Sequence, residues 1–181
     1  MISDGFIIRV GMKRKYWILS IFCVGILLLD QWTKHLVVQK IPLYRRVNVI
    51  QGFFNLTHFR NTGGAFGIFG GEKGGLGSIL FVLVSLIAIG AIIFLFLRVK
   101  EHEKALALSF SLILSGAVGN LIDRLRYGEV VDFLDFHLFS YHWPAFNIAD
   151  SAICVGIGLM ALELLKGERK KSTKSQAPNP K

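Results

Sequence analysis

An uncharged run of 22 residues, Leu76–Leu97, most constrains what this chain can fold into. A helix of about 20 apolar residues is long enough to cross the hydrocarbon core of a bilayer. Three further apolar segments accompany it, at 16–38, 105–122 and 143–165. With 52% hydrophobic residues and a mean hydropathy of +0.52, the 181-residue chain is too apolar for a soluble domain of this size. The sequence therefore predicts an all-α membrane protein with four transmembrane helices.

Basic residues beside the apolar segments indicate the topology. The net charge is +9, which in a soluble protein would favour nucleic acid as a partner. Here the basic residues flank apolar segments, so we expect membrane lipids as the partner and no nucleic acid. The two termini and the 98–104 connector carry 13 Lys and Arg residues, against 8 on the opposite side. The positive-inside rule then puts both termini in the cytoplasm.

The segment 39–75, between the first two spans, differs in composition from the spans. Pro42 ends the helix, and the runs VNVI and FFNLTHF flank Gln-Gly, which predicts short strands joined by a turn. We expect a small β-like platform on the outer membrane surface, with His58 and Arg60 as interfacial side chains. The small residues of NTGGAFG free the backbone, so Asn61 can present its amide from a turn.

The rest of the chain gives simpler expectations. Residues 1–166 read as a single membrane-embedded domain, and the basic segment 167–181 reads as a disordered cytoplasmic tail. Cys23 and Cys154 lie inside apolar segments and are interpreted as small core residues. Neither a disulfide framework nor a thiolate metal site is indicated.

Acids and carboxamides gather where the third and fourth spans meet. They are Asn120, Asp123, Asp132, Asp135, Asn147 and Asp150. Acids beside apolar segments cost free energy and call for a functional reason. Asn147 and Asp150 are three residues apart and share a helix face, with Pro144 expected at the helix start. Because the connection is short, the two helices should be antiparallel neighbours, which brings Asp132 toward Asp150.

Two carboxylates that share a site cannot both ionise cheaply. One keeps a proton and serves as general acid, while the other activates a water as general base, as in aspartic proteases and without a metal. Asp150 is the strongest candidate, because it lies seven residues past Trp143 and is expected at or below the membrane interface.

Other polar residues have simpler interpretations. Asp123 is followed by Arg124 and is typical of a cap or an ion pair, and Asp135 of a solvated loop acid. His137 and His142 match no strong metal motif, and neither HExxH nor GxSxG is present.

Asp30 and Lys34 interrupt the first apolar segment. They are four residues apart, so they share a helix face near the membrane edge. One interpretation is a functional pair, and the other is an interfacial ion pair in which the lysine extends its charge to the surface. The sequence pattern leaves both open.

Five short motifs occur in order: DQWTK (30–34), RNTGGAFG (60–67), GNLIDR (119–124), VVDF (130–133) and FNIADS (146–151). Together they resemble lipoprotein signal peptidase, the bacterial signal peptidase II family, over roughly residues 16–165. The resemblance implies a four-span aspartyl protease of the inner membrane with a β-cradle between the first two spans. It also implies the substrate, a diacylglyceryl-modified prolipoprotein that is cut just before the lipid-modified cysteine.

The resemblance implies roles for individual residues. Asp132 and Asp150 correspond to the catalytic dyad, a choice that spacing left open because Asp123 was equally visible. The supporting or substrate-contacting residues are Asp30, Lys34, Asn61, Asn120, Asp123, Arg124 and Asn147. Gly64 replaces the Ala that the family usually has, which removes no chemical group. No metal or cofactor is expected, and the protein is expected to act as a monomer with its site near the outer face.

Two other function classes fit the composition. A small proton-coupled transporter would use Asp150 to carry protons, and a non-catalytic scaffold would need no paired acids. The transporter is disfavoured because the acids gather near one face, while the second and third spans carry no charge at mid-depth to relay protons.

Overall fold

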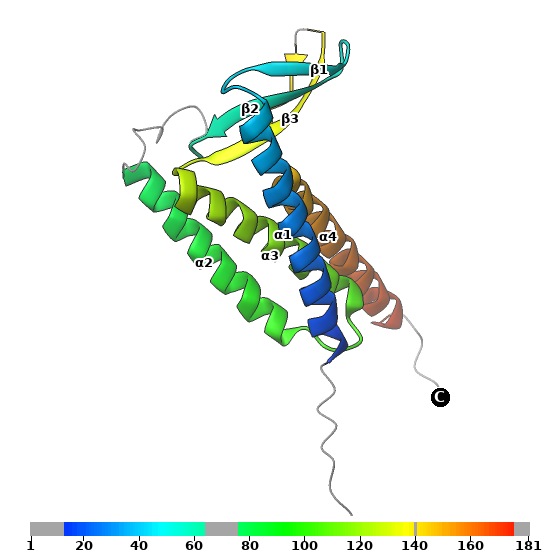
Figure 1. Cartoon of the computed structure of the whole chain (residues 1–181). Coiled ribbons are helices and arrows are strands. Elements are labelled where there is room, and N and C mark those ends of the chain that lie inside the picture. Colours follow the sequence, from blue (N-terminus) through cyan, green and yellow to red (C-terminus); the bar gives the residue numbers. More distant parts are fainter. Residues whose placement is uncertain (1–12, 64–75, 140, 176–181) are drawn as a thin grey trace, which may run out of the picture.

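The computed structural model describes residues 13–63, 76–139 and 141–175, with side chains as far as Lys166. Within these ranges four long helices form a bundle: α1 (Arg14–Lys40), α2 (Leu76–Arg98), α3 (Lys104–Tyr127) and α4 (Ile148–Ser175). Each is long and apolar enough to cross a membrane, α4 over Ile148–Lys166. A small antiparallel sheet lies across one end of the bundle (Figure 1). The predicted combination of four apolar helices and a small sheet is confirmed.

Helix α3 is the centre of the bundle. In α3, 61% of the most apolar stretch is buried inside the protein, whereas the share is 6% in α1 and in α2. The other helices therefore present most of their apolar surface outward. Small residues let the neighbours approach closely. A Cβ atom at Gly119 would lie only 2.7 Å from Oδ2 of Asp30 on α1, and one at Gly116 would collide with the carbonyl of Ala149 on α4. These two glycines therefore set the distance of α1 and α4 from α3.

The sheet has the order β1-β2-β3-β4, with β1 at Arg46–Ile50, β2 at Phe54–Asn61, β3 at Val130–Leu138 and β4 at Tyr141–His142. The two strands predicted after the first span are confirmed as β1 and β2. The connector between the last two spans, interpreted as a loop, instead forms β3 and β4. Gly128 ends α3 in the left-handed conformation, at φ +77°, which lets the chain turn directly into β3. The sheet thus draws its strands from the α1–α2 connection and the α3–α4 connection.

Helix α4 begins at Ile148, not at Trp143. Residues 143–146 are apolar but not helical, because Phe146 exchanges backbone hydrogen bonds with Leu134 of β3. Pro144 therefore lies in this connector and does not start the helix. At the other end the backbone of α4 stays helical to Ser175, into the segment expected to be disordered. Cys154 is exposed on α4, so its interpretation as a core residue is wrong, whereas Cys23 is half-buried.

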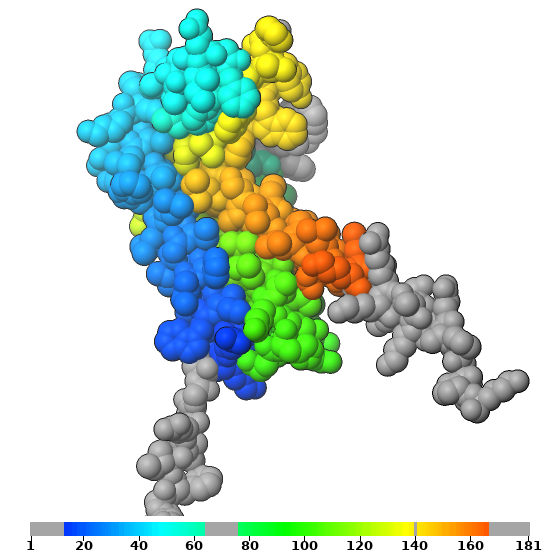
Figure 2. All heavy atoms as spheres, turned by 90° about the vertical axis from the view of Figure 1, so that its right-hand side faces the viewer, coloured from blue at the N-terminus to red at the C-terminus, as the bar shows by residue number. Residues whose placement is uncertain are grey.

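Each end of the bundle has its own apolar cluster. Val37, Ile41, Val131 and Phe133 pack where α1 meets β3, and Phe96, Val99, Ala107 and Phe110 pack at the opposite end. Lys15 is buried beside the second cluster and donates to the carbonyls of Leu97 and Val99, which end α2. In Figure 2 the cyan and yellow atoms of the sheet cover one end of the molecule, and the green α2–α3 connector lies at the other.

Candidate active site

A buried lysine lies at the centre of a polar cluster between α1 and α3. The Lys34 ammonium is 2.9 Å from Asp30, 2.9 Å from Asp123 and 3.0 Å from the side-chain oxygen of Asn120. Asp30 and Asp123 are 0% exposed and Lys34 is 2% exposed. The interpretation of Asp30 and Lys34 as a surface-reaching interfacial pair is therefore wrong. Three protein oxygens replace the water that this cation loses on burial, as a buried charge requires.

The two acids paired with Lys34 also hold the backbone of other elements. Asp30 accepts a 2.9 Å hydrogen bond from the amide of Ala149 in the first turn of α4. Asp123 accepts a 3.1 Å bond from the amide of Val131 in β3. The ion pair of Asp123 is thus with Lys34 and not, among the described contacts, with Arg124. Through these bonds the cluster fixes the two elements that carry Asp132 and Asp150.

Asn147 caps the start of α4. Its side-chain oxygen accepts from the amide of Asp150 at 3.0 Å, and a carboxylate oxygen of Asp150 accepts from the amide of Asn147 at 3.2 Å. This reciprocal pair is a capping box, which satisfies two amides that the first turn leaves free. Asp150 therefore lies in the first turn of α4 and not seven residues into a helix. The helix position expected for Asp150 was wrong, and its half-buried side chain joins the polar cluster.

Amides hold both candidate catalytic acids. Asp132 is 1% exposed and accepts from the side-chain amides of Asn147, at 2.7 Å, and Asn61, at 2.9 Å. Asp150 accepts from the amide of Asn120 at 2.8 Å. Asn147 therefore contacts one acid with its amide and the other with its oxygen and backbone. The structure brings Asp132 and Asp150 into one site, as their predicted approach requires.

Burial raises the pKa of Asp132 to about 7, well above the ordinary 3.8 of an aspartate. The charge of Asp150 raises this pKa further, while the hydrogen bonds from Asn61 and Asn147 and the charge of Lys34 oppose the increase. Near neutral pH both the protonated and the ionised form of Asp132 are populated. A carboxyl group of this kind can hold a proton and release it during a reaction.

Arg124 lies at the edge of the site. It contacts α2, with a 3.4 Å hydrogen bond to Ser85, and its guanidinium carbon is 5.9 Å from the ring centre of Phe81. It also interacts electrostatically with Asp150, Asp123 and Asp132. Its Nε atom has no hydrogen-bond partner among the described groups. Arg124 therefore supplies a positive charge close to the acids without being tied to any of them by a hydrogen bond that the structure records.

Gln31 is a residue of the site that sequence reasoning missed. Its amide donates to Asp123 at 3.0 Å, to Asp30 at 3.1 Å and to the carbonyl of Gly119 at 3.2 Å. It stands inside the DQWTK motif, three residues before Lys34, so helical spacing could have placed it on the same side of α1.

Two further expectations about the sheet are wrong. Asp135 is not a solvated loop acid, because it is 3% exposed, accepts hydrogen bonds from Asn55 and His142 and forms an ion pair with Arg46. His58 and Arg60 are not lone interfacial side chains. His58 is 5% exposed and lies 2.9 Å from the carbonyl of Ile41, and Arg60 donates to His58 and packs on the ring of Tyr127.

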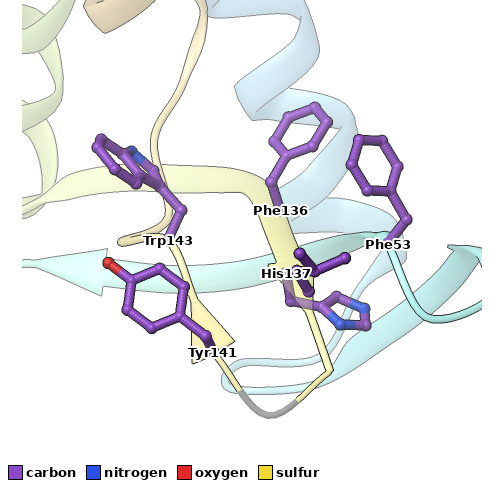
Figure 3. A pocket seen from close by; sticks show the side chains of 6 residues that line it. Phe53, Phe136, His137, Tyr141 and Trp143 are labelled. Carbon is purple, nitrogen blue, oxygen red and sulfur yellow. The ribbon is translucent and has the colours of Figure 1, made fainter.

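Two cavities open on the sheet. One has a volume of about 340 Å³, and its lining includes Asn61, which donates to Asp132, as well as Asp135 and His142. The other, of about 170 Å³, lies at the β3–β4 turn, where the side chains in Figure 3 gather; it is lined by Phe53, Phe136, His137, Leu138, Tyr141 and Trp143. The rings of His137 and His142 stack, with their centres 4.8 Å apart.

Among the described residues no group of three or more His, Cys, Asp or Glu side chains is arranged to hold a metal ion. Residues 64–67 of the NTGGAFG motif lie outside the described ranges.

Comparison with known proteins decides the family. A family model described as signal peptidase (SPase) II matches residues 22–166. The chain belongs to the signal peptidase II family. It is 45% identical over 161 residues to the lipoprotein signal peptidase of Geobacter sulfurreducens, which covers 89% of this chain and 99% of that protein. The lipoprotein signal peptidase of Halalkalibacterium halodurans is 40% identical over 157 residues, 87% of this chain and 97% of that protein.

Solved structures are similar to this signal peptidase II family member over most of its length. One, described as a bacterial membrane enzyme solved by the in meso method at 1.9 Å resolution, is 34% identical with a TM-score of 0.73 and covers 82% of this chain and 92% of its own. A second bacterial membrane enzyme, solved by the same method at 2.3 Å resolution, is 32% identical with a TM-score of 0.73. The match covers 90% of this chain and 93% of that chain. The chain is therefore a membrane-embedded protease and, by family, an aspartic peptidase.

Proposed function

We propose that this protein removes signal peptides from diacylglyceryl-modified prolipoproteins and cuts directly before the lipid-modified cysteine. In this proposal Asp132 and Asp150 are the general acid and base. The observation that carries it is the arrangement of Asn147, which donates to Asp132 at 2.7 Å and forms the capping box with Asp150. Two acids tied to one amide side chain fit the two-carboxylate mechanism that aspartic peptidases share.

The rest state follows from the surroundings of the two acids. Asp132 is buried with a pKa of about 7, so it holds the shared proton readily near neutral pH. Asp150 lies in the first turn of α4 and accepts a hydrogen bond from the backbone amide of Asn147. We therefore assign Asp132 as the general acid and Asp150 as the general base.

In the reaction, Asp150 takes a proton from a water molecule as the water oxygen bonds to the scissile carbonyl carbon. Asp132 donates its proton toward the carbonyl oxygen, which stabilises the negative charge that develops there. When the tetrahedral intermediate collapses, the C–N bond breaks and the proton held by Asp150 passes to the leaving amine. The carboxyl product keeps the water oxygen, and Asp132 regains its proton.

The supporting residues position the acids. Asn61 and Asn147 orient Asp132, Asn120 orients Asp150, and Lys34 with its two acids fixes the helices and strand that carry them. Arg124, close to the acids but not bonded to them, is available for a carbonyl group of the substrate.

The distribution of Lys and Arg residues supports the orientation that we propose for the chain. Both termini lie in the cytoplasm, the site faces the outer side of the inner membrane, and the sheet lies on the outer surface. The acyl chains of the substrate then stay in lipid while the peptide reaches the acids. Each methylene that remains buried contributes about 0.8 kcal/mol to holding the substrate there.

The test is cleavage of a lipid-modified prolipoprotein by purified protein in detergent. Asp132→Asn and Asp150→Asn should each abolish cleavage while thermal unfolding shows a folded protein. Glu163→Gln, near the end of the span Ile148–Lys166 and far along α4 from Asp150, is the matched control and should cleave normally. Cleavage by either aspartate variant at the normal rate would refute the dyad. Proton flux in sealed vesicles without proteolysis would favour the transporter instead, and loss of cleavage with a chelator would point to a metal.

A further inference from the structure

The 340 Å³ cavity lies along the sheet, and its lining includes Asn61 but neither Asp132 nor Asp150. Thr57, Phe59 and Asn61 of β2 line it, so these three side chains reach the same face of the strand. Residues 143–145 of the connector before α4 also line it. Asn61, at one end, donates to Asp132. A chain in this cavity would therefore meet the dyad at the Asn61 end.

The far end of the cavity carries a fixed charge cluster. Arg46 pairs with Thr57 across β1 and β2, and its Nε atom is 3.3 Å from Asp135. The Nδ1 atom of His142 is 2.9 Å from the other oxygen of Asp135, and Asn55 donates at 3.1 Å. These contacts occupy both carboxylate oxygens of a 3% exposed side chain. We call Arg46, Asp135 and His142 the distal cluster.

Asp135 is ionised in this cluster. Burial by itself would raise the pKa of Asp135, but hydrogen bonds from His142 and Asn55 and the charges of Arg46 and His142 together lower it below the ordinary value. Since its oxygens are already occupied, Asp135 positions the two basic side chains and does not face an occupant. Both basic residues line the cavity, and Asp135 uses only one nitrogen of each. Among the described contacts, the terminal nitrogens of Arg46 remain as donors for an occupant, and Nε2 of His142 remains as a further polar atom.

Polarity decides which part of a substrate can lie there. A signal peptide is apolar and precedes the scissile bond, so it belongs beside the apolar helices. The cavity instead lies on the sheet and is lined by charged and polar groups as well as aromatic ones. Only the polar chain that follows the bond suits it. Thr57 and Asn61 are four residues apart along an extended strand, roughly 13 Å, which matches about four residues of an extended substrate.

We propose that this cavity binds the start of the mature chain in an extended conformation. The distal cluster then recognises the side chain three to five residues after the scissile bond and favours an acidic residue there over a basic one. This inference rests on the proposed function, because it takes the dyad as the place of cleavage. The Arg46 side chain is 57% exposed, so it acts as a partly solvated charge with a moderate effect.

The experiment compares lipid-modified substrates that differ only at positions three to five after the bond, with glutamate, alanine or lysine there. For the unmodified protein we expect kcat/KM to be about tenfold higher for the glutamate than for the lysine substrate, mainly through KM. Arg46→Gln should remove most of this preference, and Arg46→Glu should reverse it. The alanine substrate, which carries no charge there, is the reference against which the other two rates are compared.

Arg45→Glu is the matched control. It makes the same charge change at the adjacent exposed residue, which does not line the cavity. If Arg45→Glu shifts the preference as much as Arg46→Glu, the effect is long-range electrostatics and the inference is wrong. Equal cleavage of all three substrates by the unmodified protein also overturns it while leaving the proposed function intact. Failure to cleave any of them refutes the proposed function itself.

Discussion

Asn147 donates a 2.7 Å hydrogen bond from its side-chain amide to Asp132, and with its oxygen it caps the helix that carries Asp150. One side chain thus sets the position of a strand acid relative to a helix acid. The side-chain amide of Asn147 is also 3.3 Å from the oxygen of Asn120, which in turn donates to Asp150. The geometry of the pair therefore depends on a carboxamide as much as on the carboxylates.

Replacing Asn147 with alanine should reduce kcat by about 100-fold or more, because loss of one positioned donor typically costs this much in a preorganised site. Loss of the cap should also destabilise the protein by about 1 kcal/mol. Steady-state cleavage and thermal unfolding in detergent measure the two effects. Gln51→Ala, at an exposed turn, is the control and should change neither. A normal kcat for Asn147→Ala would show that Asn147 is not needed to position Asp132 relative to Asp150.

Replacing Lys34 with methionine should destabilise the folded protein by about 3–5 kcal/mol, because it leaves Asp30 and Asp123 buried without their cation. The measurement is the unfolding transition in detergent. Lys40→Met makes the same change at an exposed position of the same helix and should have little effect. Equal stability of the two variants would show that the buried ion cluster contributes nothing to the fold.

The pH dependence of kcat/KM should show a loss of activity above neutral pH. Asp132 must be protonated to act as the acid, and with a pKa of about 7 it loses this proton as the pH rises through that value. The rate should therefore fall about tenfold per pH unit well above pH 7. A profile measured with substrate below KM tests this. Constant activity from pH 6 to 9 would exclude Asp132 as the general acid.

Stability should respond to pH through the same group. Because the folded pKa of Asp132 is raised above its unfolded value, the folded state binds the proton more tightly, and stability falls as the pH rises from about 4 to about 7. Asp132→Asn cannot ionise at this position and does not lose stability in this way. The free energy of unfolding of the variant minus that of the unmodified protein should therefore increase from pH 4 to pH 7, by a few kcal/mol at most. Unfolding midpoints of both proteins at pH 4 and pH 8 provide the comparison. A difference that does not change with pH would contradict the raised pKa.

The helices and the β1–β2 hairpin could be predicted because they depend on local patterns. The length of an uncharged run predicts a span, and the strand-forming residues around Gln51 and Gly52 predict a hairpin. Asn61, Asn120 and Asn147 were expected near the acids, and the structure places all three there. Arg124 was expected in the same network, and it lies at its edge.

Other parts depend on contacts between distant residues, which local patterns do not report. Strand β3 is a strand because it pairs with β2, some 75 residues earlier in the chain, as in the register of Asn55 with Asp135. That pairing is also what buries Asp135, so its interpretation as a solvated acid failed. Residues 143–146 are apolar like a helix, but pairing of Phe146 with Leu134 keeps them extended.

The 2.9 Å bond between Asp30 of the first helix and the Ala149 amide of the last has a consequence for biosynthesis. The first span leaves the ribosome long before the fourth, and until the fourth docks, Asp150 has no fixed position relative to Asp132. If the proposed mechanism holds, a chain that is still being inserted has its two acids apart and should cleave no signal peptide until its last helix docks.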